Sequence, residues 1–505
     1  MRLRPTLLIG LSLLAAAPVL AQPRKPQRAN TNAASSGAAA SQLVAAPNNT
    51  PRTLAQALVA TYAYNPALLE ERARLRTVDE GVPQALSGWR PTVVLSGNVG
   101  YADGVSRERV AGQGIKTPAA RDIGTAQALL TQPLYTGGRV DASVQRAKNA
   151  VFAERAALIG QEETSFSDTV SAYVGVIQAR QILEIQRNNE QVLAQQLQAT
   201  QDRFRVGEIT QTDVAQAQAA LASARATLLT AQGSLRTAEA AYIRAVGSAP
   251  PPDLELPQPL KLPVRNGQEA AAMAGENNPT VIAALFNLAA ARDAVDVAFA
   301  NLLPQLSLQG QAFHQSNQLI RGLDANGYQV TANLSVPLYQ GGAEYSAVRA
   351  AKQTATQQER AVADARRTAV QNAVQAWQTL EAALAAADSS RAAVAANEIA
   401  VQGEQRQALV GTATTLDVLV QTQTLLNARL TLVQNLANIV TASYAVASAI
   451  GRLTARDLGL PVVFYDDTAY YNAVKNKWFG LSGPPLSQLY HTASTSERAR
   501  GGIGR

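Results

Sequence analysis

Residues 336–342 read Val-Pro-Leu-Tyr-Gln-Gly-Gly, and this heptapeptide decides the fold. It follows residues 328–336, in which apolar and polar side chains alternate, and it opens a stretch without proline from Leu338 to Leu460. Alternation with period two is typical of a β-strand, whereas a long stretch with a period near 3.5 indicates helix. The heptapeptide therefore marks a direct joint between a strand and a very long helix.

The same joint occurs earlier, where residues 132–138 read Gln-Pro-Leu-Tyr-Thr-Gly-Gly and no proline follows until Pro250. The joints are 204 residues apart, from Pro133 to Pro337, and the upstream spacing is 213, from Pro91 to Pro304. A motif repeated at a fixed distance indicates an internal duplication. The first repeat has the longer hairpin loop, which we expect to be irregular over 104–120. The candidate joint residues are Pro133, Gly137, Gly138, Pro337, Gly341 and Gly342.

Each repeat is expected to hold short helices, one β-hairpin and one pair of long antiparallel helices. In the first repeat the predicted strands are 92–101 and 122–131, and the long helices are 139–204 and 212–246. In the second repeat the short helices are 268–303, the strands are 305–313 and 328–336, and the long helices are 343–408 and 416–450.

The flanking segments differ from the repeats in composition. Two arginines before an apolar stretch and the small-residue site Val19-Leu20-Ala21 predict a signal peptide that is cleaved after Ala21. The predicted organisation is a signal peptide at 1–21, a disordered lead-in at 22–51, the first repeat at 52–249, a proline-rich crossover at 250–265, the second repeat at 266–455, an aromatic-rich segment packed on the helices at 456–479, and a disordered tail at 480–505.

Composition argues against several function classes. The net charge of +7 is spread among acidic residues, so no nucleic-acid partner is expected. Two histidines and no cysteine provide no metal-ligand spacing, and we interpret His314 as a residue near a strand end at a barrel rim. Gly112 and Gly114 lack the strand–helix context of a phosphate-binding loop. We therefore expect no cofactor, no metal and no enzymatic activity.

No segment after residue 21 approaches 18 consecutive apolar residues, so membrane insertion would require strands of a closed barrel. Four strands are too few, because the smallest membrane barrels have about eight. Copies of the chain are therefore expected to pool their strands. A periplasmic coiled-coil adaptor or structural protein without a barrel is the alternative, but it leaves the strands and joints unexplained.

The signal peptide, the two repeats, the paired Pro-Leu-Tyr-x-Gly-Gly joints and the paired Val-Gly-x5-Asp-Val turns resemble the TolC-type outer-membrane channels over residues 52–455. The resemblance implies an α+β membrane protein: a homotrimer with a 12-stranded outer-membrane β-barrel, four strands per chain, that continues into a periplasmic α-helical barrel. It implies a passive exit duct for type I protein secretion or small-molecule efflux. The implied partners are outer-membrane lipid, a periplasmic adaptor (membrane fusion) protein and an inner-membrane ABC or proton-driven transporter.

By resemblance, the turns at Gly207 and Gly411 form the periplasmic end. After the first turn, Thr212 or Asp213 is expected to cap the next helix, and Asp417 is the counterpart of Asp213. Each aspartate has two compatible roles, as a helix N-cap or as part of a ring of charge around the tunnel mouth. In the family the inner turn also carries polar latch residues and a second acidic position, and the corresponding residues here are Ala408, Ala413 and Val420.

Overall fold

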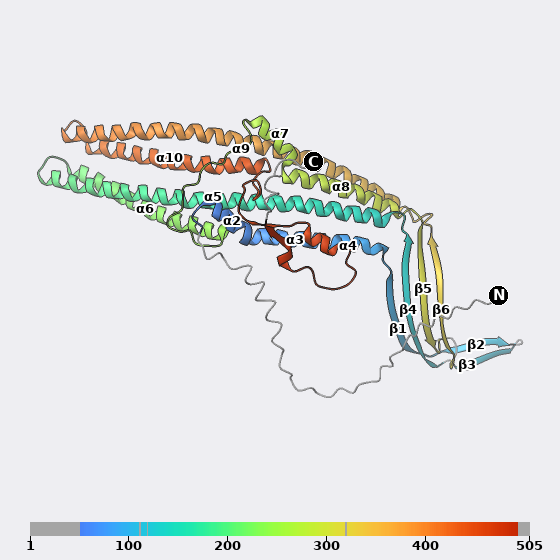
Figure 1. Ribbon diagram of the computed structural model, residues 1–505. Coiled ribbons are helices and arrows are strands. Elements are labelled where there is room, and N and C mark those ends of the chain that lie inside the picture. The colour runs from blue at the N-terminus through green and yellow to red at the C-terminus, as the bar shows by residue number, and fades with distance from the viewer. Residues whose placement is uncertain (1–50, 111–112, 119, 319–320, 493–505) are drawn as a thin grey trace. The chain divides into compact units, whose positions relative to one another are not determined.

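The computed structural model describes residues 51–110, 113–118, 120–318 and 321–492 (Figure 1). The predicted signal peptide, almost all of the lead-in and the last part of the tail lie outside these residues. The first repeat consists of α2 Leu54–Tyr64, α3 Pro66–Asp79, α4 Gly81–Leu86, η2 Ser87–Trp89, β1 Thr92–Ala102, β2 Val105–Val110, β3 Gln113–Pro118, β4 Arg121–Tyr135, α5 Arg139–Arg205 and α6 Gln211–Val246.

The second repeat has a similar order, but it lacks the additional hairpin and has the single helix α8 at the place of α3, α4 and η2. It consists of α7 Gly267–Asn277, α8 Pro279–Ala300, β5 Gln305–Ser316, β6 Asp324–Ser335, α9 Ala343–Leu409 and α10 Thr415–Ala449. A C-terminal segment follows, with β7 Val463–Tyr465, α11 Ala469–Val474, η3 Leu486–Leu489 and β8 Tyr490–Thr492.

The prediction of an irregular loop at 104–120 is wrong for most of the described residues. β2 and β3 pair as an antiparallel hairpin, with Val105 opposite Pro118 and Val110 opposite Gln113. Glycines and charged residues obscured the strand pattern in the sequence. A hairpin needs only its backbone groups paired, and polar side chains are compatible with that.

The main sheet has the strand order β1-β4-β5-β6, and all its pairs are antiparallel (Figure 1). The central pair, β4 with β5, joins the two repeats, with Thr131 opposite Gln309. Within the described residues, β1 and β6 each have one strand neighbour in this sheet. An unpaired strand edge presents free backbone donors and acceptors.

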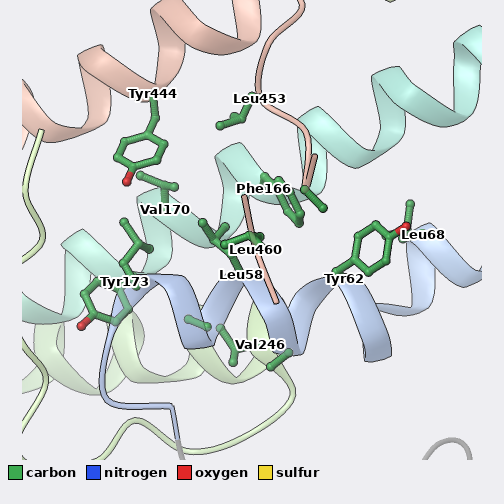
Figure 2. Close-up of a cluster of buried hydrophobic side chains, with 14 of the residues drawn as sticks. Leu58, Tyr62, Leu68, Phe166, Val170, Tyr173, Val246, Tyr444, Leu453 and Leu460 are labelled. Atoms are coloured by element: carbon green, nitrogen blue, oxygen red, sulfur yellow. The ribbon is translucent and has the colours of Figure 1, made fainter. Parts of the chain in front are cut away.

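The long helices pair as α5 with α6 and α9 with α10. Figure 2 shows the main apolar cluster, where Leu58 and Tyr62 of α2 meet Phe166, Val170 and Tyr173 of α5. Among the described helices, α10 is the one long and apolar enough by composition to cross a membrane. The same composition suits a packed helix, and α10 packs along α9 and against α5.

Both repeats fasten their short helices in the same way. Asn65 accepts hydrogen bonds from the N–H groups that open α3, and its Nδ2 donates to the carbonyl of Ala245, 3.2 Å away. Asn278 caps α8 likewise and donates to the carbonyl of Ala449 at 3.1 Å. One amide side chain thus satisfies a helix start and the end of a long helix together.

The C-terminal segment packs on the first repeat. The guanidinium of Arg72, which is 2% exposed, lies over the rings of Tyr62 and Tyr465 at 4.5 and 5.2 Å. Leu489 is fully buried. The prediction of a disordered tail from residue 480 is therefore wrong for residues 486–492, because η3 and β8 are held by this core and by pairing with β7.

Candidate functional site

One face of the sheet is lined mostly by polar side chains, with Val94, Leu129 and Phe313 among them. Nε2 of Gln329 in β6 donates to Oε1 of Gln311 in β5 at 2.7 Å, and Nε2 of Gln311 donates to Oε1 of Gln127 in β4 at 2.8 Å. Strand pairing places Thr331 on the same face, opposite Gln309. These three glutamines form a ladder that runs from the second repeat into the first, across the β4–β5 pair.

The opposite face of the sheet is apolar. Leu95 lies opposite Ala128, and Gly310 pairs with both Leu130 and Val330. Since successive side chains of a strand point to opposite faces, Ala332 and Leu334 lie on this face too. His314 lies on it two residues before the end of β5, opposite Ala126 and Asn326. A sheet with one apolar and one polar face is what a barrel between lipid and water requires.

The strand–helix joints use their glycines identically. Gly137 and Gly341 both have a φ of 64°, and Gly138 and Gly342, at the N-cap positions of α5 and α9, both have a φ of 82°. Residues with a side chain rarely adopt these left-handed values, whereas glycine adopts them readily. The paired glycines therefore let the chain turn sharply from strand to helix.

The prolines of the two joints stand at different places. Pro133 lies within β4, beside the register shift that precedes Tyr135. Pro337 lies just after β6, which ends at Ser335. Proline has no N–H to donate to a sheet, and both positions tolerate this.

At the two tips, the helix caps differ from the prediction. The N-caps of α6 and α10 are Thr210 and Thr414, so the assignment of Thr212, Asp213 or Asp417 to this position is wrong. Each threonine accepts a hydrogen bond from the N–H of the aspartate three residues later, and each aspartate accepts one from the threonine N–H at 2.9 Å.

These reciprocal bonds form a capping box with aspartate at the third helical position. The aspartate Oδ2 also accepts the threonine hydroxyl hydrogen, at 2.7 Å for Asp213 and 2.6 Å for Asp417. Hydrogen bonds from the threonine hydroxyl and N–H lower the pKa of both carboxyls, so both stay ionised. The Thr-x-x-Asp pattern in the sequence is the signal that could have identified these caps. Thr212 is the second residue of α6.

Gly207 and Gly411 end the preceding helices with φ values of 82° and 75°. The first tip adds an ion pair, with Nε of Arg203 2.9 Å from Oε2 of Glu208. In the second tip the equivalent contact is neutral, because the hydroxyl of Thr412 donates to the carbonyl of Gln407 at 3.1 Å. The two tips therefore share a backbone but differ in charge.

The predicted latch positions provide no polar contact through their side chains. Ala408 lies in the last turn of α9, Ala413 in the tip, and Val420 is exposed on α10. The hairpins hold themselves through arginines at equivalent positions: Arg225 pairs with Glu190 at 3.0 Å, and Arg429 pairs with Glu398 at 2.7 Å.

The family profile described as "Outer membrane efflux protein" matches residues 57–248 and 271–452, which are the two repeats. The chain belongs to this family. It is 35% identical to the outer membrane efflux protein BepC of Brucella suis, over 86% of this chain and 92% of BepC. It is 25% identical to the outer membrane protein TolC of Escherichia coli, over 78% of this chain and 81% of TolC.

Solved family structures have the same fold. The Vibrio cholerae outer membrane protein VceC superposes with a TM-score of 0.67 at 22% identity, over 79% of this chain and 96% of VceC. The Campylobacter jejuni outer membrane channel CmeC gives 0.70 at 16% identity, over 79% of this chain and 86% of CmeC. The predicted fold class and the outer-membrane location of this family of channel proteins are thus confirmed.

Proposed function

We propose that the protein is the passive exit duct of a tripartite export system, and that three copies close one barrel and one tunnel. The observation that carries the proposal is the sheet: four strands, one polar face, and two edges that pair with no further strand among the described residues of this sheet. Four strands cannot enclose a pore, and open edges in lipid would leave backbone groups unpaired.

The duplication supplies the register of the closing pair. β4 and β6 are equivalent strands 204 residues apart, and β1 and β5 are equivalent strands 213 residues apart. Inside the chain, Thr131 of β4 is opposite Gln309 of β5. The equivalent pair between subunits is Ser335 of one copy opposite Ser96 of the next. Both serines lie on the polar face, as a single continuous barrel requires.

Transport energy is assigned to an inner-membrane ABC or proton-driven transporter, reached through a periplasmic adaptor. Val206 and Val410, at equivalent places in the tips, are 73% and 74% exposed. Exposed apolar side chains at both tips suit contact with a partner protein. We assign Asp417 to the mouth as a fixed negative charge that concentrates cations, with Asp213 in a lesser role.

The test is a disulfide between subunits. The chain contains no cysteine, so Ser96→Cys with Ser335→Cys introduces the only thiols. Oxidation of membranes carrying this variant should give a covalent trimer on a denaturing gel, because the paired Cα atoms fall within disulfide range. The matched control is Ser96→Cys with Thr331→Cys, which is four residues out of register, or about 13 Å.

Monomer only in the first variant, with normal export to the outer membrane, would contradict the closing pair. Crosslinking of both variants would contradict the register. Ion conductance in planar bilayers is the functional readout, and a covalent trimer that conducts no ions would exclude the duct.

A further inference from the structure

A short apolar run in the C-terminal segment faces solvent. Trp478 is 57% exposed and Phe479 86% exposed, and Leu481 is fully exposed. The two aromatic rings lie 6.4 Å apart. The other aromatic residues of this segment, such as Tyr465, are packed into the first-repeat core. The run contains three large apolar side chains within four residues. Their exposure to water is unfavourable in free energy unless something covers them.

The run is held in place at its base. Nη1 of Arg90 donates to the carbonyl of Lys477 at 2.7 Å, and its guanidinium lies 4.8 Å from the ring centroid of Trp478. The ammonium of Lys477 donates to the carbonyl of Ser482, which closes the loop. The hydroxyl of Tyr470 donates to Glu80 at 2.8 Å and secures the preceding helix. The apolar tip is thus a fixed protrusion.

The position of this loop is set by Arg90. Arg90 is two residues before Thr92, where β1 begins, so at most about 7 Å of chain separates them. The neighbouring Gly88 is packed against Val140 in the first turn of α5, next to the strand–helix joint. The loop therefore lies at the level where helix gives way to barrel strand. In an outer-membrane protein this level is the periplasmic surface of the bilayer.

We propose that Trp478, Phe479 and Leu481 form a lipid anchor that inserts into the periplasmic leaflet of the outer membrane. Tryptophan and other aromatic side chains favour the boundary between headgroups and acyl chains. Lys477 and Arg90 flank the rings and complement the phosphate groups of phospholipids. The apolar face of the sheet, which includes Leu95 of β1, begins at the same level of the molecule.

The chain permits a direct optical test, because it has three tryptophans, Trp89, Trp377 and Trp478. Trp89→Phe with Trp377→Phe leaves Trp478 as the only emitter. Trp89→Phe with Trp478→Phe leaves Trp377, which is 34 residues into α9 and about 50 Å from the joint. Each variant is reconstituted in phospholipid vesicles with and without brominated acyl chains. Emission from Trp478 should fall by about half, since its ring lies at headgroup level, and emission from Trp377 should not change.

A second pair of variants tests the insertion. Phe479→Ser with Leu481→Ser, in the Trp478-only background, should abolish most of the quenching, because the neighbouring rings no longer insert. Leu256→Ser, at a crossover residue that is 65% exposed, should leave it intact.

Two outcomes would overturn the proposal. Quenching of Trp478 by aqueous acrylamide but not by bromolipid would place the loop in water. Protection from both quenchers would place it against a second copy of the chain.

Discussion

The helices α5 and α9 are equally long and the glycines of the two joints have the same φ values, but the two repeats differ in the elements that pack against them. α5 packs against α2, α3 and α4 of its own repeat, against its partner α6, and against α8 and α10 of the second repeat. α9 packs against α7, α8 and α10, all from its own repeat. The counterpart of the α5–α8 contact would be α9 against α3 or α4 of another copy. The first repeat thus has these contacts within its own chain, and in the proposed trimer a neighbouring subunit would supply them to the second repeat.

The comparison extends to two carboxyl side chains of α5. Glu162 and Glu163 of α5 accept hydrogen bonds from the N–H groups of Ala455 and Leu453, at 2.6 and 3.3 Å, where the chain leaves the second repeat. The equivalent residues of α9 are Arg366 and Arg367, and both are exposed. Among the described residues, these two carboxyl groups of α5 hold the start of the C-terminal segment, which explains the acids in the first repeat.

The largest expected effect concerns the joint glycines. An alanine Cβ at Gly137 would lie 2.8 Å from Cβ of Leu303 and 2.9 Å from the carbonyl oxygen of Ala300, whereas at Gly341 no atom of the described residues would lie within 4 Å. Left-handed φ alone costs about 1–2 kcal/mol and overpacking about 1–3 kcal/mol more. Gly137→Ala should therefore destabilise the protein by the sum of both terms.

Gly341→Ala should destabilise the proposed trimer as much, because a neighbouring subunit would fill the equivalent space there. Thermal unfolding of both variants in detergent measures this. A markedly milder effect at Gly341 would contradict the presence of a neighbouring subunit at this place in the trimer.

The next effect compares the faces of equivalent strands. Val330→Arg in β6 and Ala126→Arg in β4 place a charge on the apolar face and should each cost about 2–4 kcal/mol if the site is near mid-membrane. Thr331→Arg, on the polar face, is the control and should cost little. The yield of heat-resistant oligomer in membranes is the measure. Similar losses from Val330→Arg and Thr331→Arg would reject the lipid assignment of that face.

A smaller effect depends on pH. Burial raises the pKa of Glu163 to about 8 from its ordinary value of 4.5, and the charge of Glu162 adds to this. At pH values between these two pKa values, Glu163 keeps its proton in the folded protein and loses it in the unfolded chain. The free energy of unfolding should therefore fall as pH rises from about 5 to 8. The slope is at most about 1.4 kcal/mol per pH unit for one carboxyl.

Glu163→Gln should flatten this dependence, as judged by unfolding midpoints across the same range. Arg367→Gln, at the equivalent place in the second repeat, should leave the slope as it is in the parent. A parent protein whose stability is constant from pH 5 to 8 would contradict a buried, protonated Glu163.

The smallest effect on stability, and the most specific for conduction, is expected at the tips. Asp417→Asn should lower cation selectivity in planar bilayers, and Asp213→Asn should lower it less. Thr414→Val removes the hydroxyl of the same capping box but keeps the charge, so selectivity should persist. Unchanged selectivity in Asp417→Asn would leave this residue with its capping role alone.

Much of the architecture followed from local patterns in the sequence. The switch of period at the joints and the proline-free stretches were enough to predict the strands and the long helices. The capping threonines were missed because Thr212 and Asp213 stand directly before the apolar seam that begins at Val214, whereas the true caps, Thr210 and Thr414, stand three residues before their aspartates. The strands β2 and β3 were missed because their residues are mostly polar.

The structure of tail residues 486–492 could not be predicted from their neighbours in sequence. The hydroxyl of Tyr490 lies 3.5 Å from Nη1 of Arg72. The two residues are 418 positions apart in the sequence. A contact of this kind leaves no periodic pattern in either segment. Burial of Leu489 depends on the same distant partner surface.

The two long helices each contain 67 residues, and each begins directly after its joint. Insertions or deletions in one of these helices would therefore shift its tip along the helix axis relative to the other tip. A change of seven residues in α5 alone would displace one tip by about 10 Å. A change in tunnel length therefore requires matched changes in α5, α6, α9 and α10. We expect the lengths of these helices to vary far less among relatives than the residues on their surfaces.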